Sequence, residues 1–149
     1  KSKKEIFLLN LFLFFLFLEE KMSLLGFPKK EHLTGETRIK KVLSEGDSFI
    51  VFPLRIIFIE QTEKREEPAI RILFSVPKKR FKHAVDRNKL KRRLREAYRK
   101  NKTILWQDIE ERNTTLEIAV LYISNDFYRF DTLNKKIKES LIKIKDRLK

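Results

Sequence analysis

The segment 78–100 (KKRFKHAVDRNKLKRRLREAYRK) constrains the fold more than any other part of the chain. It carries twelve Lys or Arg against two acidic residues, a net charge of +10, whereas the whole chain of 149 residues carries +14. A charge gathered so tightly does not determine a fold, but it predicts a polyanionic partner or an anionic membrane surface. The segment must therefore fold in a way that keeps its cations accessible.

Most of this segment is predicted to form a helix from Arg87 to about Lys100, with Asp86 placed to cap it. At 100° per residue the apolar side chains gather on one side, which consists of Leu90, Leu94, Ala97 and Tyr98. The opposite side carries Asn88, Lys91, Arg92, Arg95 and Arg99, with Arg87 at the border. Like charges four residues apart destabilise a helix by roughly a few tenths of a kcal/mol per pair. A face that repels itself in this way is best explained by nucleic acid, because planar guanidinium groups suit phosphate.

The rest of the composition gives little support for a protein active site. The chain has no Cys, and its two His residues, His32 and His83, lie far apart, so no cluster with metal-ligand spacing is predicted. With three Gly in the whole chain, a glycine-rich phosphate loop is not expected either. We therefore expect no catalytic residue, no metal site and no cofactor bound by a protein motif.

The first 21 residues differ from the rest of the chain. Residues 6–18 (IFLLNLFLFFLFL) are almost wholly apolar and lie between short charged stretches. This run is shorter than the about 20 residues that a helix needs to span a bilayer, and no small-residue cleavage site follows it. Because the only Met is Met22, we expect residues 1–21 to be an upstream extension absent from the mature protein, and residues 22–149 to form one domain. A membrane or export segment is the alternative.

From Met22 onward the patterns predict a small α+β domain. The expected elements are helices at 36–44, 87–100 and from a cap at Asp131 or Thr132 onward, a turn or short helix at 104–112, and strands at 48–60, 69–76 and 116–124. Gly46 is placed to end the first helix. The last helix has an apolar stripe of Leu133, Ile137, Leu141, Ile144 and Leu148. The strand–helix–strand order across 69–124 favours a mixed sheet packed by helices.

Five stretches of the chain form a distinctive combination of motifs. The first is an Arg-Asn-Lys block with trailing basic residues at 87–97 (RNKLKRRLREA). It follows SVPKK at 75–79 and Ala84-Val85, and His32-Leu33 lies upstream with 38–48 (RIKKVLSEGDS). Together these stretches resemble the protein component of bacterial ribonuclease P, and the similarity runs from about Phe27 to the C-terminus.

The resemblance implies a fold with the order helix–strand–strand–strand–helix–strand–helix. It also implies a left-handed crossover between parallel strands, similar to that of some ribosomal proteins. Division of the 48–60 strand at Pro53, a position that favours a bulge or an edge, would supply the fourth strand. The function implied is that of a protein subunit of ribonuclease P, the endonuclease that removes the 5′ leader from precursor tRNA. In that family the RNA subunit and its Mg²⁺ carry out the hydrolysis. The resemblance also implies a cytoplasmic ribonucleoprotein.

Two sets of site residues carry over from the resemblance. The residues expected to bind the RNA subunit are Arg87, Asn88, Lys89, Lys91, Arg92 and Arg95. The residues expected to bind the leader of precursor tRNA, in a cleft between the first helix and the sheet, are Ile39, Leu43, Ser75, Lys78 and Lys79.

The chain departs from the family pattern at several of these positions. Lys89 stands where the family has Arg, which keeps the charge but loses bidentate geometry. Pro77 stands where the family usually has Ser. Ile39 and Leu43 stand where the family often has Phe, so apolar contact with little base stacking is expected there.

Two other functions fit the same sequence. One is a general RNA-binding protein of the ribosomal type, which would need the same cationic helix. The other is a membrane-surface protein that uses residues 6–18 and the basic helix together.

Overall fold

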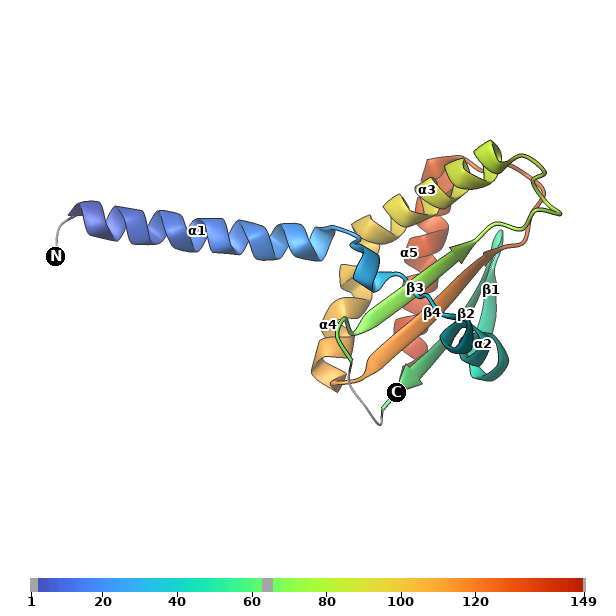
Figure 1. The fold of residues 1–149 in the computed structure, drawn as a ribbon, viewed down its shortest axis with the longest axis horizontal. Helices are drawn as coiled ribbons and strands as arrows, with labels where there is room; N and C mark the ends of the chain where they lie inside the picture. Colours follow the sequence, from blue (N-terminus) through green and yellow to red (C-terminus); the bar gives the residue numbers. More distant parts are fainter. Residues whose placement is uncertain (1–2, 63–65, 149) are drawn as a thin grey trace.

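The computed structural model describes residues 3–62 and 66–148, with residues 15–25 described by their backbone alone (Figure 1). Its elements, in chain order, are α1 (Lys3–Leu25), η1 (Lys29–Glu31), α2 (Glu36–Glu45), β1 (Asp47–Val51), β2 (Leu54–Gln61), β3 (Ile70–Ser75), α3 (Ala84–Asn101), α4 (Thr103–Arg112), β4 (Thr115–Tyr122) and α5 (Phe130–Arg147). The charged segment between β2 and β3 lies partly outside the described residues. The predicted α+β class is confirmed.

The four strands form one mixed sheet in the order β1-β2-β4-β3. β1 pairs with β2 and β2 with β4 in antiparallel fashion, whereas β3 runs parallel to β4. The single strand expected at 48–60 is wrong, because the backbone turns at Phe52 and Pro53 and the two halves pair as a hairpin. Proline has no N–H to donate to a ladder, so a turn is a favourable place for it. The division at Pro53 that the resemblance implied is therefore confirmed.

Helices cover both faces of the sheet, because side chains alternate between the faces along each strand. On β2, Ile56 and Phe58 face the main core, which α3, α4 and α5 close. Ile57 points to the opposite face and packs with Val42 of α2 in a smaller apolar cluster. Since α2 is short, it covers only part of its face of the sheet.

α3 and α5 bury the stripes that the sequence predicted. The buried residues are Leu90, Leu94, Ala97 and Tyr98 on α3 and Leu133, Ile137, Leu141, Ile144 and Leu148 at α5. The predicted caps are wrong: both helices begin earlier, after His83 and Arg129, and neither of these residues makes a side-chain capping bond. Asp86 and Asp131 lie in the first turns instead, where a carboxylate still complements the partial positive charge of a helix N-terminus.

Gly46 ends α2, as predicted, but not through left-handed backbone. Its φ is −71°, and its N–H donates to the carbonyl oxygen of Val42 at 2.9 Å. A Cβ at this position would lie 2.5 Å from that oxygen and 2.9 Å from the carbonyl oxygen of Phe58. Glycine is needed here because α2 turns into β1 so close to the sheet that no side chain fits.

A buried ion pair fixes the stretch before α2 to the rest of the domain. Lys102, at the junction of α3 and α4, places its Nζ 2.9 and 3.3 Å from the two carboxylate oxygens of Glu31. The two side chains are 1% and 4% exposed. Burial raises the pKa of Glu31 above its ordinary value of 4.5, although Lys102 partly opposes this. Phe27 adds ring contacts with Phe74 and Tyr98 on the same side of the domain.

Glu60, near the end of β2, joins the sheet to the end of α4. Arg112 donates to both carboxylate oxygens of Glu60, at 2.7 and 2.8 Å, and the Thr114 hydroxyl donates at 2.6 Å. The Arg112 guanidinium, helped by the hydroxyl, holds the pKa of Glu60 below its ordinary 4.5. This carboxylate therefore favours the folded state as long as it stays ionised.

Replacing Glu60 with Gln should make the free energy of unfolding less dependent on pH in the acid range. Because the pKa of Glu60 is lower in the folded state, its contribution is complete above 4.5 and is lost as the pH falls through the folded pKa. Free energies of unfolding from denaturant melts across the acid range measure this loss, and Arg112→Leu should flatten the same limb. Part of the slope will persist, because Arg38 and Arg71 also lower the pKa of Glu66. A Glu60→Gln variant with the full wild-type slope would contradict the assignment.

α1 leaves the body of the domain as a single projecting helix (Figure 1). The large apolar side chains between Ile6 and Phe14 are exposed. The helix continues through Met22 to Leu25, so its end does not coincide with the domain boundary predicted after residue 21. Within residues 3–62 and 66–148, no helix has both the length and the apolar character that a membrane span requires. That residues 1–21 are absent from the mature protein stays a prediction from the sequence.

Candidate nucleic-acid interface

The face of α3 opposite its buried stripe carries the residues that are predicted to bind the RNA subunit. Asn88, Lys89, Arg92 and Arg95 are exposed, and Arg87 and Lys91 are half-buried. Leu90 and Leu94 are fully buried in the main core, which turns the cationic face outward. Arg99, predicted on the same face, pairs with Glu96 at 2.6 Å and so neutralises one carboxylate on the helix itself. The helical geometry predicted from the sequence therefore holds.

Arg87 shapes the loop before α3 as well as contributing charge. Its guanidinium donates to the carbonyl oxygens of Phe81 and Lys82, both at 2.9 Å. These bonds fold the basic loop 78–83 against the first turn of α3. The free backbone N–H groups of a helix N-terminus attract anions, so cations of the loop and of the helix act on the same region.

α2 contributes the apolar residues that are predicted to contact the leader. The cluster beneath α2 consists of Leu33, Val42, Ile57 and Ala119. Ile39 is half-buried against this cluster, whereas Leu43 is 45% exposed. Leu43 therefore offers its side chain to a ligand, while Ile39 mainly holds α2 on the sheet.

An uncovered part of the sheet lies beside α2, on the same face. The strand alternation places Leu73 and Ser75 of β3 and Leu121 of β4 there, all half-buried, and Ser75 is paired with Leu121 in register. We call these three residues the open strip. It contains Ser75, one of the residues that are predicted to bind the leader.

Lys78 and Lys79 begin the turn that follows β3, and both are exposed. The N–H groups of Arg80 and Phe81 donate to the carbonyl oxygen of Pro77 at 3.1 and 3.3 Å, which closes the turn. The two lysines consequently lie beyond the end of the open strip that Ser75 marks. Proteins bind single-stranded nucleic acid through positive charge combined with surfaces for the bases. Here the lysines supply the charge, and the aliphatic strip supplies contact without stacking.

A hollow of about 170 Å³ lies between β3 and α3. It is lined by Phe27, His32, Leu33, Thr34, Ile72, Leu73, Phe74 and Arg95. Leu73 and Arg95 meet here, so the open strip and the cationic face of α3 are neighbours. Burial, and then the charge of Arg95, lower the pKa of His32 below 6.5. Its Nε2 atom is buried and has no hydrogen-bond partner in the described part of the chain.

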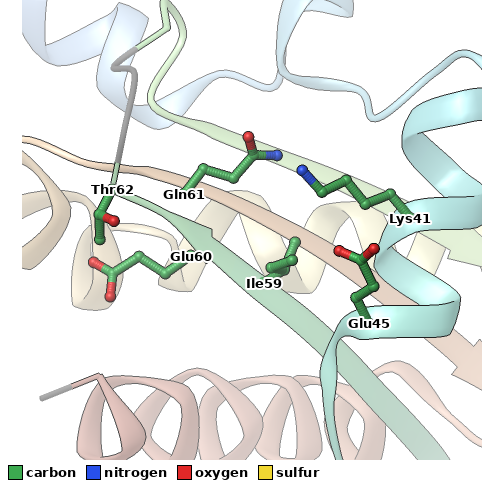
Figure 2. Close-up of a pocket in the computed structure, with 6 residues that line it drawn as sticks. All are labelled: Lys41, Glu45, Ile59, Glu60, Gln61 and Thr62. Carbon is green, nitrogen blue, oxygen red and sulfur yellow. The ribbon is translucent and has the colours of Figure 1, made fainter.

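A second pocket, of about 200 Å³, lies at the opposite end of the sheet from Ser75. It is lined by Lys41, Glu45, Ile59, Glu60, Gln61 and Thr62. Figure 2 shows Lys41 and Glu45 reaching from α2 toward the space beside Gln61 of β2. With two carboxylates against one amine, this pocket does not suit a polyanion.

Sequence reasoning missed a group of residues at the other border of α3. Arg93, which belongs to neither of the predicted faces, lies with its Cζ 4.7 Å from the ring centroid of Phe127. Lys89 lies over the same ring, 5.8 Å from its centroid. The basic segment showed Arg93, but only the fold brings the β4–α5 loop, which carries Phe127, beside it.

These features define the class of the protein. A cationic helix is mounted on a mixed sheet by its apolar stripe, and an open apolar strip with lysines at its end lies alongside. Fields of this sign and shape attract nucleic acid, and the strip suits single strands better than duplexes. The chain is an α+β protein built to bind RNA.

Comparison with known proteins identifies the family. The family model for ribonuclease P matches residues 27–145. Relatives described as ribonuclease P protein components include one from Porphyromonas gingivalis, 40% identical over 119 residues, which cover 80% of this chain and 86% of that protein. Another, from Chlorobium phaeobacteroides, is 40% identical over 126 residues, with 78% of this chain and 86% of that protein covered. The chain belongs to the ribonuclease P protein family, the protein subunits of a tRNA-processing endoribonuclease.

Solved structures show the same fold. The RNase P protein of Staphylococcus aureus superposes with a TM-score of 0.60 at 21% identity, over 78% of this chain and 96% of that one. The RNase P protein from Thermotoga maritima gives a TM-score of 0.59 at 24% identity, over 76% and 96%. Membership of this family replaces the alternative of a ribosomal-type RNA-binding protein.

Proposed function

We propose that the cationic face of α3 binds the RNA subunit of ribonuclease P and that the open strip binds the 5′ leader of precursor tRNA. The observation that carries the proposal is the opposition of the two faces of α3. Leu90 and Leu94 are fully buried, while Arg92 and Arg95 are exposed on the other side. The cationic side chains of such a helix can bind phosphates without disturbing the core that holds the helix.

The leader path follows from the position of the open strip. It lies next to Arg95 across the hollow and ends near Lys78 and Lys79. A strand of RNA leaving α3 would cross apolar surface and then meet two ammonium groups. Leu43 and the open strip are aliphatic or small, so contact with the leader should be only weakly base-selective.

The hydrolysis itself is assigned to the RNA subunit and its Mg²⁺, in the cytoplasm. Two polyanions, the RNA subunit and precursor tRNA, must approach closely for this reaction. Cations of the protein offset their repulsion and take the place of condensed counterions. The protein should therefore lower the concentration of Mg²⁺ that the reaction needs.

A reconstitution assay tests the proposal directly. The purified chain is combined with the organism's ribonuclease P RNA, and cleavage of precursor tRNA is followed over a series of Mg²⁺ concentrations. Cleavage at low Mg²⁺ should require the chain. If the RNA cleaves equally well with and without the chain at every Mg²⁺ concentration, the proposed role is wrong.

Replacing both Lys78 and Lys79 with Ala should weaken binding of precursor tRNA much more than binding of mature tRNA. Only the precursor has a leader. Each phosphate that loses its lysine should make the negative slope of log affinity against log salt shallower by about 0.7 for a single strand. Binding of the two tRNA forms to the reconstituted holoenzyme measures the difference. Cleavage at saturating substrate should change little.

The matched control removes two exposed lysines from α5, as Lys138→Ala with Lys145→Ala. This variant loses the same charge at a distance from the open strip, so it should affect both tRNA forms equally and weakly. An equal loss for both forms in the Lys78 and Lys79 variant would assign these lysines to the RNA subunit or to the body of the tRNA.

A further inference from the structure

Phe127, in the loop between β4 and α5, presents an aromatic ring on the surface beside α3. Its side chain is 39% exposed, whereas Phe49, Phe58 and Phe74 are buried. Its edge-to-face contact with Phe81, at 6.0 Å between centroids, anchors the ring from below the surface. The ring is therefore held in place and is still open to a ligand.

Two cations lie over this ring. Arg93 lies 4.7 Å and Lys89 5.8 Å from its centroid. Arg93 also donates to the carbonyl oxygen of Tyr128 at 2.6 Å, which fixes its guanidinium beside the ring. From the loop after β3, Arg80 donates to the side-chain oxygen of Asn125 at 3.3 Å. A nucleotide presents a flat base and a phosphate, and this surface offers an aromatic face next to positive charge.

The loop that carries Phe127 is braced by Tyr122. The Tyr122 hydroxyl donates to the carbonyl oxygen of Asp126 at 2.6 Å and accepts from the N–H of Tyr128 at 3.2 Å. The N–H of Asp126 donates to the Ser124 hydroxyl at 3.0 Å. Bonds on both sides of Phe127 hold the loop in one shape, so little ordering has to accompany binding.

We propose that Phe127, flanked by Arg93 and Lys89, stacks on an unpaired base of the RNA that lies along α3. This inference rests on the proposed function, since Lys89 belongs both to the cationic face of α3 and to the surround of the ring. RNA passing over Lys89 brings its bases within reach of the ring. A paired base is already stacked within its helix, so the site selects a base that is bulged or in a loop.

The test uses two RNA hairpins as probes. One carries a single bulged adenosine in its stem, and the other carries an abasic nucleotide at the same position. The wild-type chain should bind the bulged adenosine more tightly by roughly 5- to 100-fold, the usual effect of stacking one base on an aromatic side chain. With 2-aminopurine in place of the adenosine, fluorescence quenching on binding reports the stacking itself.

Phe127→Leu should reduce the ratio of the two affinities to about one, and Phe127→Tyr should keep it, because the ring is retained. The matched control is Ile142→Ala on α5, which removes an apolar side chain of similar exposure, 42%. It should leave the ratio unchanged. Thermal melts of all variants separate loss of stacking from loss of fold.

The possible outcomes distinguish this inference from the proposed function. A wild-type ratio near one, or an unchanged ratio in Phe127→Leu, would overturn the stacking site. In either case salt-dependent binding of both hairpins would persist if α3 binds RNA. If neither hairpin binds in a salt-dependent way, the RNA-binding role of α3 fails first and the stacking site fails with it.

Discussion

Replacing Lys102 with Met should lower the free energy of unfolding by about 3–5 kcal/mol, the usual result of removing one partner from a buried ion pair. The substitution leaves the carboxylate of Glu31 buried, at 3% residue exposure, without its cation. A domain of this size is stable by only about 5–15 kcal/mol, so the variant should be close to unfolding at neutral pH. Denaturant melts of the wild type and the variant measure the loss.

The pH dependence of the same variant gives an independent check. Burial already raises the pKa of Glu31 above 4.5, and removal of Lys102 should raise it further. A group with a raised folded pKa favours the folded state at low pH and loses that contribution as the pH rises. The Lys102→Met variant should therefore regain stability as the pH is lowered toward the ordinary pKa of a glutamate.

The double variant Glu31→Leu with Lys102→Met serves as the control. It removes both charges and keeps apolar volume, so most of the lost stability should return. If the free energy of unfolding of Lys102→Met lies within about 1 kcal/mol of the wild-type value, the ion pair is not what holds the stretch before α2 in place.

Replacing both Arg92 and Arg95 with Ala should weaken binding to the ribonuclease P RNA by roughly 10- to 100-fold at moderate salt. The negative slope of log affinity against log salt should also become shallower, by about 0.7–0.9 for each phosphate that the arginines no longer neutralise. Both side chains are exposed, so the melting temperature should hardly change. A salt titration of RNA binding, run beside a thermal melt, measures both quantities.

Leu94→Ala is the matched variant on the opposite face of the same helix. Leu94 is fully buried, and its truncation should cost about 2–5 kcal/mol of stability while leaving the salt slope unchanged. An unchanged salt slope in the double Arg variant would mean that the RNA lies on another surface of the protein.

The parts of the fold that the sequence predicted are those with a strong local period. Leu90, Leu94 and Tyr98 recur at helical spacing, and one buried face with one cationic face follows from geometry alone. The stripe of α5 is predictable for the same reason. The family resemblance added the fourth strand and the two sets of site residues, which the periodicity of the chain could not supply.

Contacts between distant segments could not be predicted in this way. Glu31 and Lys102 are 71 positions apart, and each appears in the sequence as an ordinary charged surface residue. The approach of Phe127 to Arg93 likewise depends on how the β4–α5 loop packs beside α3. The predicted caps failed because the backbone of His83 and Arg129, and not a side-chain oxygen, begins each helix.

The sheet order has a consequence for how this chain is made. β4 pairs with both β2 and β3, yet it is the last of the four strands to be synthesised. On the ribosome, the β1–β2 hairpin can form early, whereas β3 must wait for β4, which follows the two helices α3 and α4. Until β4 emerges, β2 and β3 present unpaired edges, and the main core lacks the strand that lies between them. The domain therefore cannot be divided into an earlier and a later half, and it folds as one unit only after β4 has been synthesised.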